Sequence, residues 1–445
     1  MELTFDLWEC AFSQLDRDVG LHLPRNCLLF LHNRVEKLNI VLPALQGQSV
    51  YSDYQHFILG TRKMFEEVIL RAPTLSALSI YFSCEISSIV DDVSMLARGL
   101  ENLRELYLPP STLTTGLFTE LIRLPSVDTI GFFELSDRSK SFEDIVGFAK
   151  NDNFDSDVPN LRNLKLAGGY RYMKSFFDRD IDVAYPNLTS LTLRMVQNYS
   201  PNQLSPLLSD ISSSCPRLTA LNLCRYPNVK ELALVDVGDL EALTCFTSLR
   251  EFTLDCYYPV SLTDDELVSI LSNCPSLRSI RLSYQPSEFN TPSMSLNLLG
   301  ELALAGSEIE ELYLYVDSEF TAPTTLPPGC RLRRLRSLCF GDSPISDQES
   351  VAAYLYQFLP FDLVTYPAVL TNNSTNAERN ERRKAWQGVQ TLLRFSQRVR
   401  EADITRINEL KDEVEKLRRN VEVVNQADGH ETGSFELPSP VDLVG

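Results

Sequence analysis

The stretch Cys274-Pro275-Ser276-Leu277-Arg278-Ser279-Ile280-Arg281-Leu282 decides the fold of this chain. It has the form Pro-x-Leu-x-x-Leu-x-Leu, and its last positions alternate apolar and polar residues, the period of a β-strand with one buried face. The phrase returns at intervals of about thirty residues, and such a period is typical of a repeat architecture. Its copies centre on Leu78, Leu106, Ile130, Leu164, Leu191, Leu221, Phe252, Ile280, Leu312 and Leu338.

Weaker signals lie at the ends and in the middle of this array. A weak strand is expected at Val35–Val41, and a half-phrase at Phe361–Val364 closes the array. The extra match Pro227–Leu234 lies too close to the copy at Leu221 to leave room for a helix. It is either part of a connecting arm or a local irregularity of the array. Residues 1–34 are expected to form an N-terminal helical cap or remnant, with a short helix at Asn26–Leu31.

Helices with readable starts lie between the phrases. Ser200-Pro201 offers an N-cap followed by proline at the first helical position. Thr263-Asp264-Asp265-Glu266 has the spacing of a capping box, and Ser346-Asp347-Gln348-Glu349 repeats it. A weaker start lies at Thr114, and another helix fits Thr61–Leu70. Each repeat is therefore expected to hold a strand, a turn and an amphipathic helix.

The spacing of the two kinds of element predicts a curved array. Strands pair at ~4.8 Å, whereas helices pack at ~8–10 Å, so the strands must lie inside and the helices outside. Every step is strand, helix, parallel strand, and such crossovers are right-handed. The fold class predicted for residues 35–370 is therefore α/β: a right-handed solenoid, or horseshoe, with a parallel concave sheet and outer helices.

The composition changes beyond the array. Residues 371–377 are a polar linker, and residues 378–425 read as a long charged, amphipathic helix. Its first half could pack on the array through Trp386, Val389, Leu392 and Leu393. Residues 426–445 are expected to be a disordered acidic tail. The second half of the helix carries a near-heptad stripe typical of a coiled coil, formed by Ile407, Leu410, Val414, Leu417, Val421 and Val424.

The repeats resemble a known family. The unit that runs from Leu254-Asp255-Cys256 through the Thr263 helix to Cys274 and Leu282 is similar to the cysteine-containing leucine-rich repeat of F-box proteins. Leu338-Cys339-Phe340 resembles the start of another unit. The resemblance covers roughly residues 35–365, and the charged helix after the last repeat is similar to fungal F-box/leucine-rich-repeat proteins. No recognisable F-box accompanies it, because the nearest match, Leu23-Pro24-Arg25-Asn26, lacks the acidic residue.

Composition and charge narrow the classes of partner and compartment. The 445 residues carry a formal net charge of -19, which argues against nucleic acid because that partner needs a basic surface. The ten cysteines include no Cys-x-x-Cys pair and are expected to be small buried side chains in a reducing compartment. No secretory signal is recognisable. The apolar window Val351–Leu370 is interrupted and reads as a helix followed by a strand, so we expect no membrane partner and a cytoplasmic or nuclear protein.

The sequence contains no recognisable catalytic, cofactor or metal site. It has no phosphate-binding loop, no His-Glu-x-x-His and no Gly-x-Ser-x-Gly, and its four histidines have no metal-ligand spacing. Gly168-Gly169 is expected to be a turn, and the acidic run Asn151–Asp157 a solvated linker rather than a calcium loop. The basic cluster Arg331–Arg336 is expected to be a solvated turn, with an acidic partner as the alternative.

The concave face is the expected binding surface. In Leu-x-x-Leu-x-Leu, the residues beside the last two leucines point away from the core, and tyrosine and arginine are enriched at binding hot spots. The alternative is that these positions carry residues of good strand propensity and nothing more. The candidate protein-binding residues are Tyr107, Lys165, Arg194, Asn222, Asp255, Arg281, Tyr313 and Tyr315.

Three functions are compatible with this pattern. The resemblance implies a non-enzymatic protein-interaction module, the substrate-recognition part of an SCF-type ubiquitin-ligase adaptor. Its partners would be a protein substrate on the concave face and, with an F-box upstream of Met1, the ligase's linker subunit. The missing F-box favours the alternative, a leucine-rich-repeat scaffold or inhibitor unconnected to a ligase. A third possible function is the regulation of GTPases. It is less favoured because no single exposed arginine in the sequence is marked out as a catalytic finger.

Overall fold

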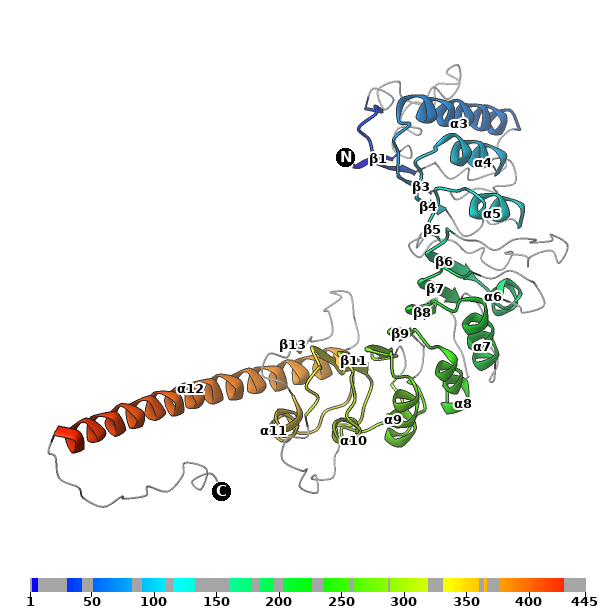
Figure 1. The fold of residues 1–445 in the computed structure, drawn as a ribbon. Helices are drawn as coiled ribbons and strands as arrows, with labels where there is room; N and C mark the ends of the chain where they lie inside the picture. Colours follow the sequence, from blue (N-terminus) through cyan, green and yellow to red (C-terminus); the bar gives the residue numbers. More distant parts are fainter. Residues whose placement is uncertain are drawn as a thin grey trace.

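One open parallel sheet runs through the whole array (Figure 1). The computed structural model describes residues 2–6, 30–41, 51–81, 90–108, 115–132, 160–177, 185–195, 203–225, 235–255, 259–286, 289–318, 331–359, 364–365 and 377–427. Within them, thirteen strands lie side by side in chain order. The strands are β1 (Glu2–Asp6), β2 (Lys37–Val41), β3 (Ala77–Tyr81), β4 (Glu105–Leu108), β5 (Thr129–Phe132), β6 (Asn163–Gly168), β7 (Ser190–Met195), β8 (Ala220–Arg225), β9 (Glu251–Leu254), β10 (Ser279–Leu282), β11 (Glu311–Leu314), β12 (Ser337–Cys339) and β13 (Val364–Thr365).

The helices lie along the outer side of this curved stack (Figure 1). Each helix except the last follows a strand and returns the chain to the start of the next one, as the crossover of a parallel pair requires, whereas the last helix follows the final strand and runs away from the array (Figure 1). They are α3 (Tyr51–Arg71), α4 (Val90–Gly99), α5 (Thr115–Ile122), α6 (Tyr170–Phe177), α7 (Leu204–Ser214), α8 (Val237–Leu240) with a 3-10 turn at Glu241–Cys245, α9 (Asp264–Asn273), α10 (Leu298–Leu304), α11 (Gln348–Phe358) and α12 (Ala377–Ala427). The chain is a right-handed α/β solenoid of the leucine-rich-repeat type, as predicted.

The repeated phrase forms the sheet because its leucines stack in register. In β10, Ile280 and Leu282 are fully buried, and Ile280 lies between Phe252 of β9 and Leu312 of β11. All ten predicted centres lie in strands, and the weaker signal at Val35–Val41 corresponds to β2. Of the signal at Phe361–Val364 only Val364 lies among the described residues, and it begins β13. Each rung thus adds a buried leucine to one continuous core, which is how a repeat array gains stability. The extra match at Pro227–Leu234 lies outside the described residues.

Polar side chains in the turns tie each repeat to the preceding one. The Asn102 side chain donates to the carbonyl of Pro73 at 3.1 Å, and Asn160 donates to the carbonyl of Pro125 at 3.0 Å. The Ser276 hydroxyl donates to the Thr247 carbonyl at 2.8 Å. These residues occupy the x after the proline or its equivalent. The variable position of the phrase therefore satisfies backbone carbonyls that the helix-to-strand turn leaves without a partner.

The N-terminus departs from the expected helical cap. Residues Glu2–Asp6 form β1, which pairs in parallel with β2 and sets Leu3 opposite Leu38. The prediction of a helical segment was wrong here because Leu3 and Phe5 alternate like a strand but lack the preceding Pro-x-Leu. Most of Asn26–Leu31 lies outside the described residues.

The helix starts follow the predicted chemistry at one site and differ at another. At α9, Thr263 and Glu266 form the predicted reciprocal capping box. At α11 the N-cap is Asp347 rather than Ser346. The predicted cap at Ser200 lies outside the described residues, and α7 begins at Leu204, after Gln203, whose side chain makes no capping hydrogen bond. A later start leaves Pro206 in the first turn, where proline is tolerated.

The last helix, α12, has two different halves. Trp386, Val389 and Leu393 are buried and join the core of the array, and α12 packs against α11. The predicted packing of the first half is thus confirmed, and the helix extends slightly beyond the predicted 378–425. The interrupted window Val351–Leu370 contains α11 and β13, as expected. None of the helices in the described part of the chain is long and apolar enough to cross a membrane.

Candidate binding surface

The inner face of the sheet presents a regular row of side chains. Tyr107, Arg281 and Tyr313 each lie between two fully buried leucine-type positions of their strand and are themselves only half-buried. Because the strands are parallel and in register, equivalent positions of successive repeats lie side by side. Two groups of side chains on this inner face contact one another, one group in each half of the array.

The first group, here called the Tyr107 cluster, comprises Glu105, Tyr107, Gly131 and Lys165. Tyr107 of β4 lies opposite Gly131 of β5. A Cβ on Gly131 would lie 2.6 Å from Cδ1 of Tyr107, so the ring covers a place that only glycine leaves open. Lys165 Nζ of β6 lies 5.8 Å from the ring centroid. Two of the predicted residues, Tyr107 and Lys165, are thus brought together by a glycine that the sequence prediction did not single out.

Electrostatics around Tyr107 keep its phenol neutral. Its hydroxyl donates to Glu105 Oε2 at 3.4 Å. Burial raises the pKa of Tyr107, and the negative charge and the hydrogen bond of Glu105 raise it further. A protonated phenol beside an ammonium group offers a partner both a donor and an aromatic face.

The second group, the Arg281 cluster, comprises Ser279, Arg281, Tyr284, Glu311, Tyr313 and Ser337. Arg281 Nη2 lies 2.8 Å from Glu311 Oε2, and its guanidinium carbon lies 4.3 Å from the centroid of the Tyr313 ring. Tyr284 packs edge-on against Tyr313, with centroids 5.4 Å apart. Arginine over a tyrosine face is a cation–π contact, so Arg281 and Tyr313 are held in one arrangement.

Hydrogen bonds complete this cluster. Ser279 Oγ donates to Glu311 Oε2 at 3.0 Å, and the Tyr313 hydroxyl lies 2.8 Å from Ser337 Oγ. Burial opposes the charge of Arg281, but the Glu311 hydrogen bond and the neighbouring negative groups outweigh it and raise the pKa of the guanidinium. Burial also raises the pKa of Tyr284. The cluster is therefore a cation that Glu311 holds against the face of the Tyr313 ring, with Tyr284 packed against the same ring.

Three other predicted residues lie on the rungs between the clusters. Arg194 of β7 is opposite Cys224 of β8, and Asn222 of β8 is opposite Thr192 and Thr253. Asn222 Oδ1 accepts a hydrogen bond from the Cys224 thiol at 3.0 Å. Asp255, which follows β9, is exposed. The structure places these three residues on successive repeats, those of β7, β8 and β9.

The prediction for Tyr315 was wrong. Strand β11 ends at Leu314, so the alternation stops there. Tyr315 is buried inside the protein, with 2% of its surface exposed. Its hydroxyl donates to the Asn290 carbonyl at 3.2 Å and accepts from Arg382 Nη1 at 2.9 Å. Burial raises its pKa. Tyr315 therefore belongs to the attachment of α12 and not to the inner face.

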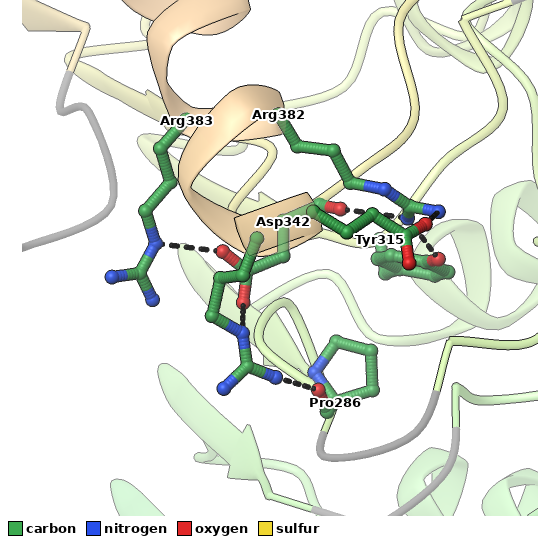
Figure 2. A network of polar contacts seen from close by, with 7 residues as sticks. Pro286, Tyr315, Asp342, Arg382 and Arg383 are labelled. Carbon is green, nitrogen blue, oxygen red and sulfur yellow. Dashed lines mark hydrogen bonds and ion pairs between the residues drawn. The ribbon is translucent and has the colours of Figure 1, made fainter. Parts of the chain in front are cut away.

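The attachment of α12 is a buried ion network, here called the Asp342 latch (Figure 2). Asp342 is fully buried; Arg383 Nε donates to its Oδ1 at 2.8 Å, and Arg379 Nε lies 2.8 Å from its Oδ2. The Arg379 contact is an ion pair whose geometry falls short of a hydrogen bond. Arg379 also donates to the Pro286 carbonyl at 2.7 Å, and Arg382 donates to the Asp342 carbonyl at 3.1 Å. One helix end thus holds the segments that follow β10, β11 and β12.

Sequence reasoning missed this latch, although it left a signal. Arg379, Arg382 and Arg383 have helical spacing and continue into the apolar face at Trp386 and Val389. Trp386 Nε1 donates to the Ser343 carbonyl at 3.0 Å, and its ring lies 5.0 Å from that of Phe340. A basic and aromatic face on one helix therefore marked a docking surface, but its acidic partner could be identified only in three dimensions.

The remaining candidate sites have ordinary structural roles where they are described. In the basic turn, Arg334 pairs with Glu308 at 2.5 Å and Arg336 with Glu310 at 3.4 Å. Gly168 ends β6, and α6 begins two residues later. No cluster of three or more possible metal ligands occurs among the described residues. The acidic run Asn151–Asp157 lies outside them.

Comparisons with known proteins reach only distant structural neighbours. No protein-family model matches the chain, and no curated protein matches it in sequence. A protein of Bacteroides fragilis is similar over 62% of this chain and 77% of its own length, with 14% identity and a TM-score of 0.35. A chain of the TLR13–ssRNA13 complex is similar over 70% of this chain and 44% of its own length, with 14% identity and a TM-score of 0.29.

Proposed function

We propose that the chain is a non-enzymatic protein-interaction module that binds a partner protein on the inner face of its sheet. The observation that carries this is the pair of preorganised clusters around Tyr107 and Arg281. Tyrosine and arginine dominate binding hot spots, and here both are fixed by neighbours before any partner arrives. Binding to side chains that are already ordered costs less conformational entropy.

The charges of the two clusters favour a partner of mixed character. Each cluster holds one cation and one carboxylate at a tyrosine: Lys165 lies over the Tyr107 ring, whose hydroxyl donates to Glu105, and Arg281 pairs with Glu311 over the Tyr313 ring. A purely acidic or purely basic ligand would meet one repelling group in each cluster. A protein segment with apolar or aromatic side chains and amide groups would use the rings and the hydrogen-bonding groups together. The two clusters lie on different repeats, so such a segment would extend along the array.

A comparison of two matched variants of the full chain tests this function. The concave variant carries Tyr107→Ala, Arg281→Ala and Tyr313→Ala, and the convex variant carries Leu59→Ala, Leu70→Ala and Leu304→Ala at exposed outer positions. In a pull-down with each protein as bait, the partner proteins that the wild type and the convex variant both recover should be recovered at least tenfold less by the concave variant. Equal recovery of the same proteins by the concave variant would contradict the proposal.

The finer assignment, a substrate-recognition part of an SCF-type ubiquitin-ligase adaptor, is supported by the resemblance of the repeats to F-box/leucine-rich-repeat proteins. Binding of the full chain to the purified linker subunit of that ligase tests it by calorimetry. Binding supports the adaptor. Clean absence of binding leaves the scaffold or inhibitor as the proposed role, since that role needs the concave face alone.

A further inference from the structure

The second half of α12 presents an apolar row to solvent. Every residue from 401 to 422 is exposed, and Figure 1 shows this part of the helix running away from the array. The exposed large apolar side chains on it lie on one face, and from Ile407 onward they follow alternating steps of three and four residues. Between 43% and 64% of each is exposed in this set: Ile404, Ile407, Leu410, Val414, Leu417 and Val421.

The order of residue types in the row favours a two-stranded partner. Ile407, Val414 and Val421 occupy the a positions of a heptad, and Leu410 and Leu417 occupy the d positions. β-branched residues at a with leucine at d favour parallel dimers over higher oligomers. The nearest a and d positions toward the array are Arg400 and Asp403, so the stripe begins where the helix has left its contact with α11.

The flanking charges favour a parallel rather than an antiparallel pair. In a parallel pair, Glu413 at position g meets Arg418 at position e of the other chain, and this attraction occurs twice by symmetry. The like-charged Arg406 and Lys411 also meet, but Arg406 lies 3.4 Å from Glu409 of its own helix, which offsets part of that repulsion. In an antiparallel pair with full overlap of the stripe, Lys411 would face Arg418 twice.

We infer that α12 pairs through residues 404–422 with the same segment of a second copy of this chain, in a parallel, in-register coiled coil. The Asp342 latch fixes the first half of α12 to the array, so a parallel pair sets both arrays at the same end of the coil. Two inner faces would then act together, and a partner with two binding segments would gain avidity without any new contact.

Sedimentation of the full chain over a range of concentrations tests the association. Wild type should shift from one to two chain masses as concentration rises, because a coil of about three heptads is only marginally stable. Leu410→Lys with Leu417→Lys should remain monomeric, whereas Thr405→Lys with Asn408→Lys, which adds the same charge outside the stripe, should dimerise like wild type. All four positions are exposed, so the array should fold equally in both variants.

A cysteine at a d position tests the direction of the pair. In a parallel in-register dimer, position 417 meets itself, so oxidised Leu417→Cys should give a covalent dimer that Asn408→Cys does not give. A wild type that stays monomeric at every concentration would overturn the inference. So would a dimer that persists in the Leu410→Lys, Leu417→Lys variant, or equal cross-linking of the two cysteine variants.

Discussion

Two tyrosines two positions apart show how a single residue's role depends on where its strand ends. Tyr313 lies inside β11 and faces inward across the sheet, where it contacts Arg281. Tyr315 would share that face if the strand continued, but it turns into the protein and bonds Arg382. Alternation in the sequence predicts the first position. The second depends on partners 25 and 67 residues away in sequence, which no local pattern contains.

The buried thiol of Cys339 should be unreactive in the folded protein. Burial raises its pKa to about 11, so about 0.1% of it is thiolate at pH 8. Iodoacetamide at pH 8 should therefore label the exposed Cys245 but leave Cys339 unmodified, as peptide mass spectrometry can measure. Both should label in denaturant. Because the folded pKa is raised, this group lowers folding stability as pH rises above about 8.5 and towards 11.

The ion pair of the Arg281 cluster should couple measurably but modestly. Both side chains are 38% exposed, so a double-mutant cycle of Arg281→Ala and Glu311→Ala should give about 0.5–1 kcal/mol of coupling in urea denaturation. The cycle of Arg406→Ala and Glu409→Ala, on a far more exposed pair, is the control and should give less. Equal coupling in both cycles would mean that the cluster does not hold Arg281 in place.

At the scale of elements, the strands were predicted well because their signal is local. The pattern Leu-x-Leu after a turn is enough to predict each strand, and the alternation of apolar and polar residues predicts which face is buried. β1 was missed since it lacks the preceding proline phrase, although its register against β2 is regular. Helix starts were less predictable because several Ser, Thr or Asp residues compete as caps. At α7 the buried positions Leu204, Leu207 and Ile211 determine where the helix begins.

Removal of the cap of α9 should destabilise the array more than a change at the start of α7. Thr263→Ala removes the oxygen that accepts from Glu266 N at 3.4 Å, so the free energy of unfolding should fall by about 1 kcal/mol. Gln203→Ala should change it by less than about 0.5 kcal/mol, because Gln203 makes no capping hydrogen bond. Chemical denaturation of both variants gives the comparison, and an equal loss would remove the assigned role of the box.

At the scale of the whole molecule, the Asp342 latch joins elements that are distant in sequence. Arg379 contacts the segments after β10 and β12 and so makes α12 part of the array. The sequence predicted the helix and its packing face. It did not predict the buried carboxylate, because Asp342 is an ordinary turn residue until three arginines are folded onto it.

Neutralisation of that carboxylate should release α12. Asp342→Asn leaves the buried guanidinium of Arg383 and the partly exposed one of Arg379 without their counter-charge, which should cost about 3 kcal/mol. Trp386, which packs on Phe340, should then move into water, and its fluorescence should shift to the red. Glu378→Gln removes only the exposed carboxylate that pairs with Arg382 and should leave the emission unchanged. Unchanged emission in Asp342→Asn would contradict the latch.

Site-specific photo-cross-linking tests the central claim, that the inner face binds a protein, most directly. A benzophenone amino acid would replace Tyr107 or Tyr313 on the inner face and, as controls, Leu70 or Leu304, both exposed on outer helices. If the inner face binds a protein, positions 107 and 313 should cross-link the same partner protein and positions 70 and 304 should not. Cross-linking of that partner from the outer positions, with none from the inner ones, would contradict the claim.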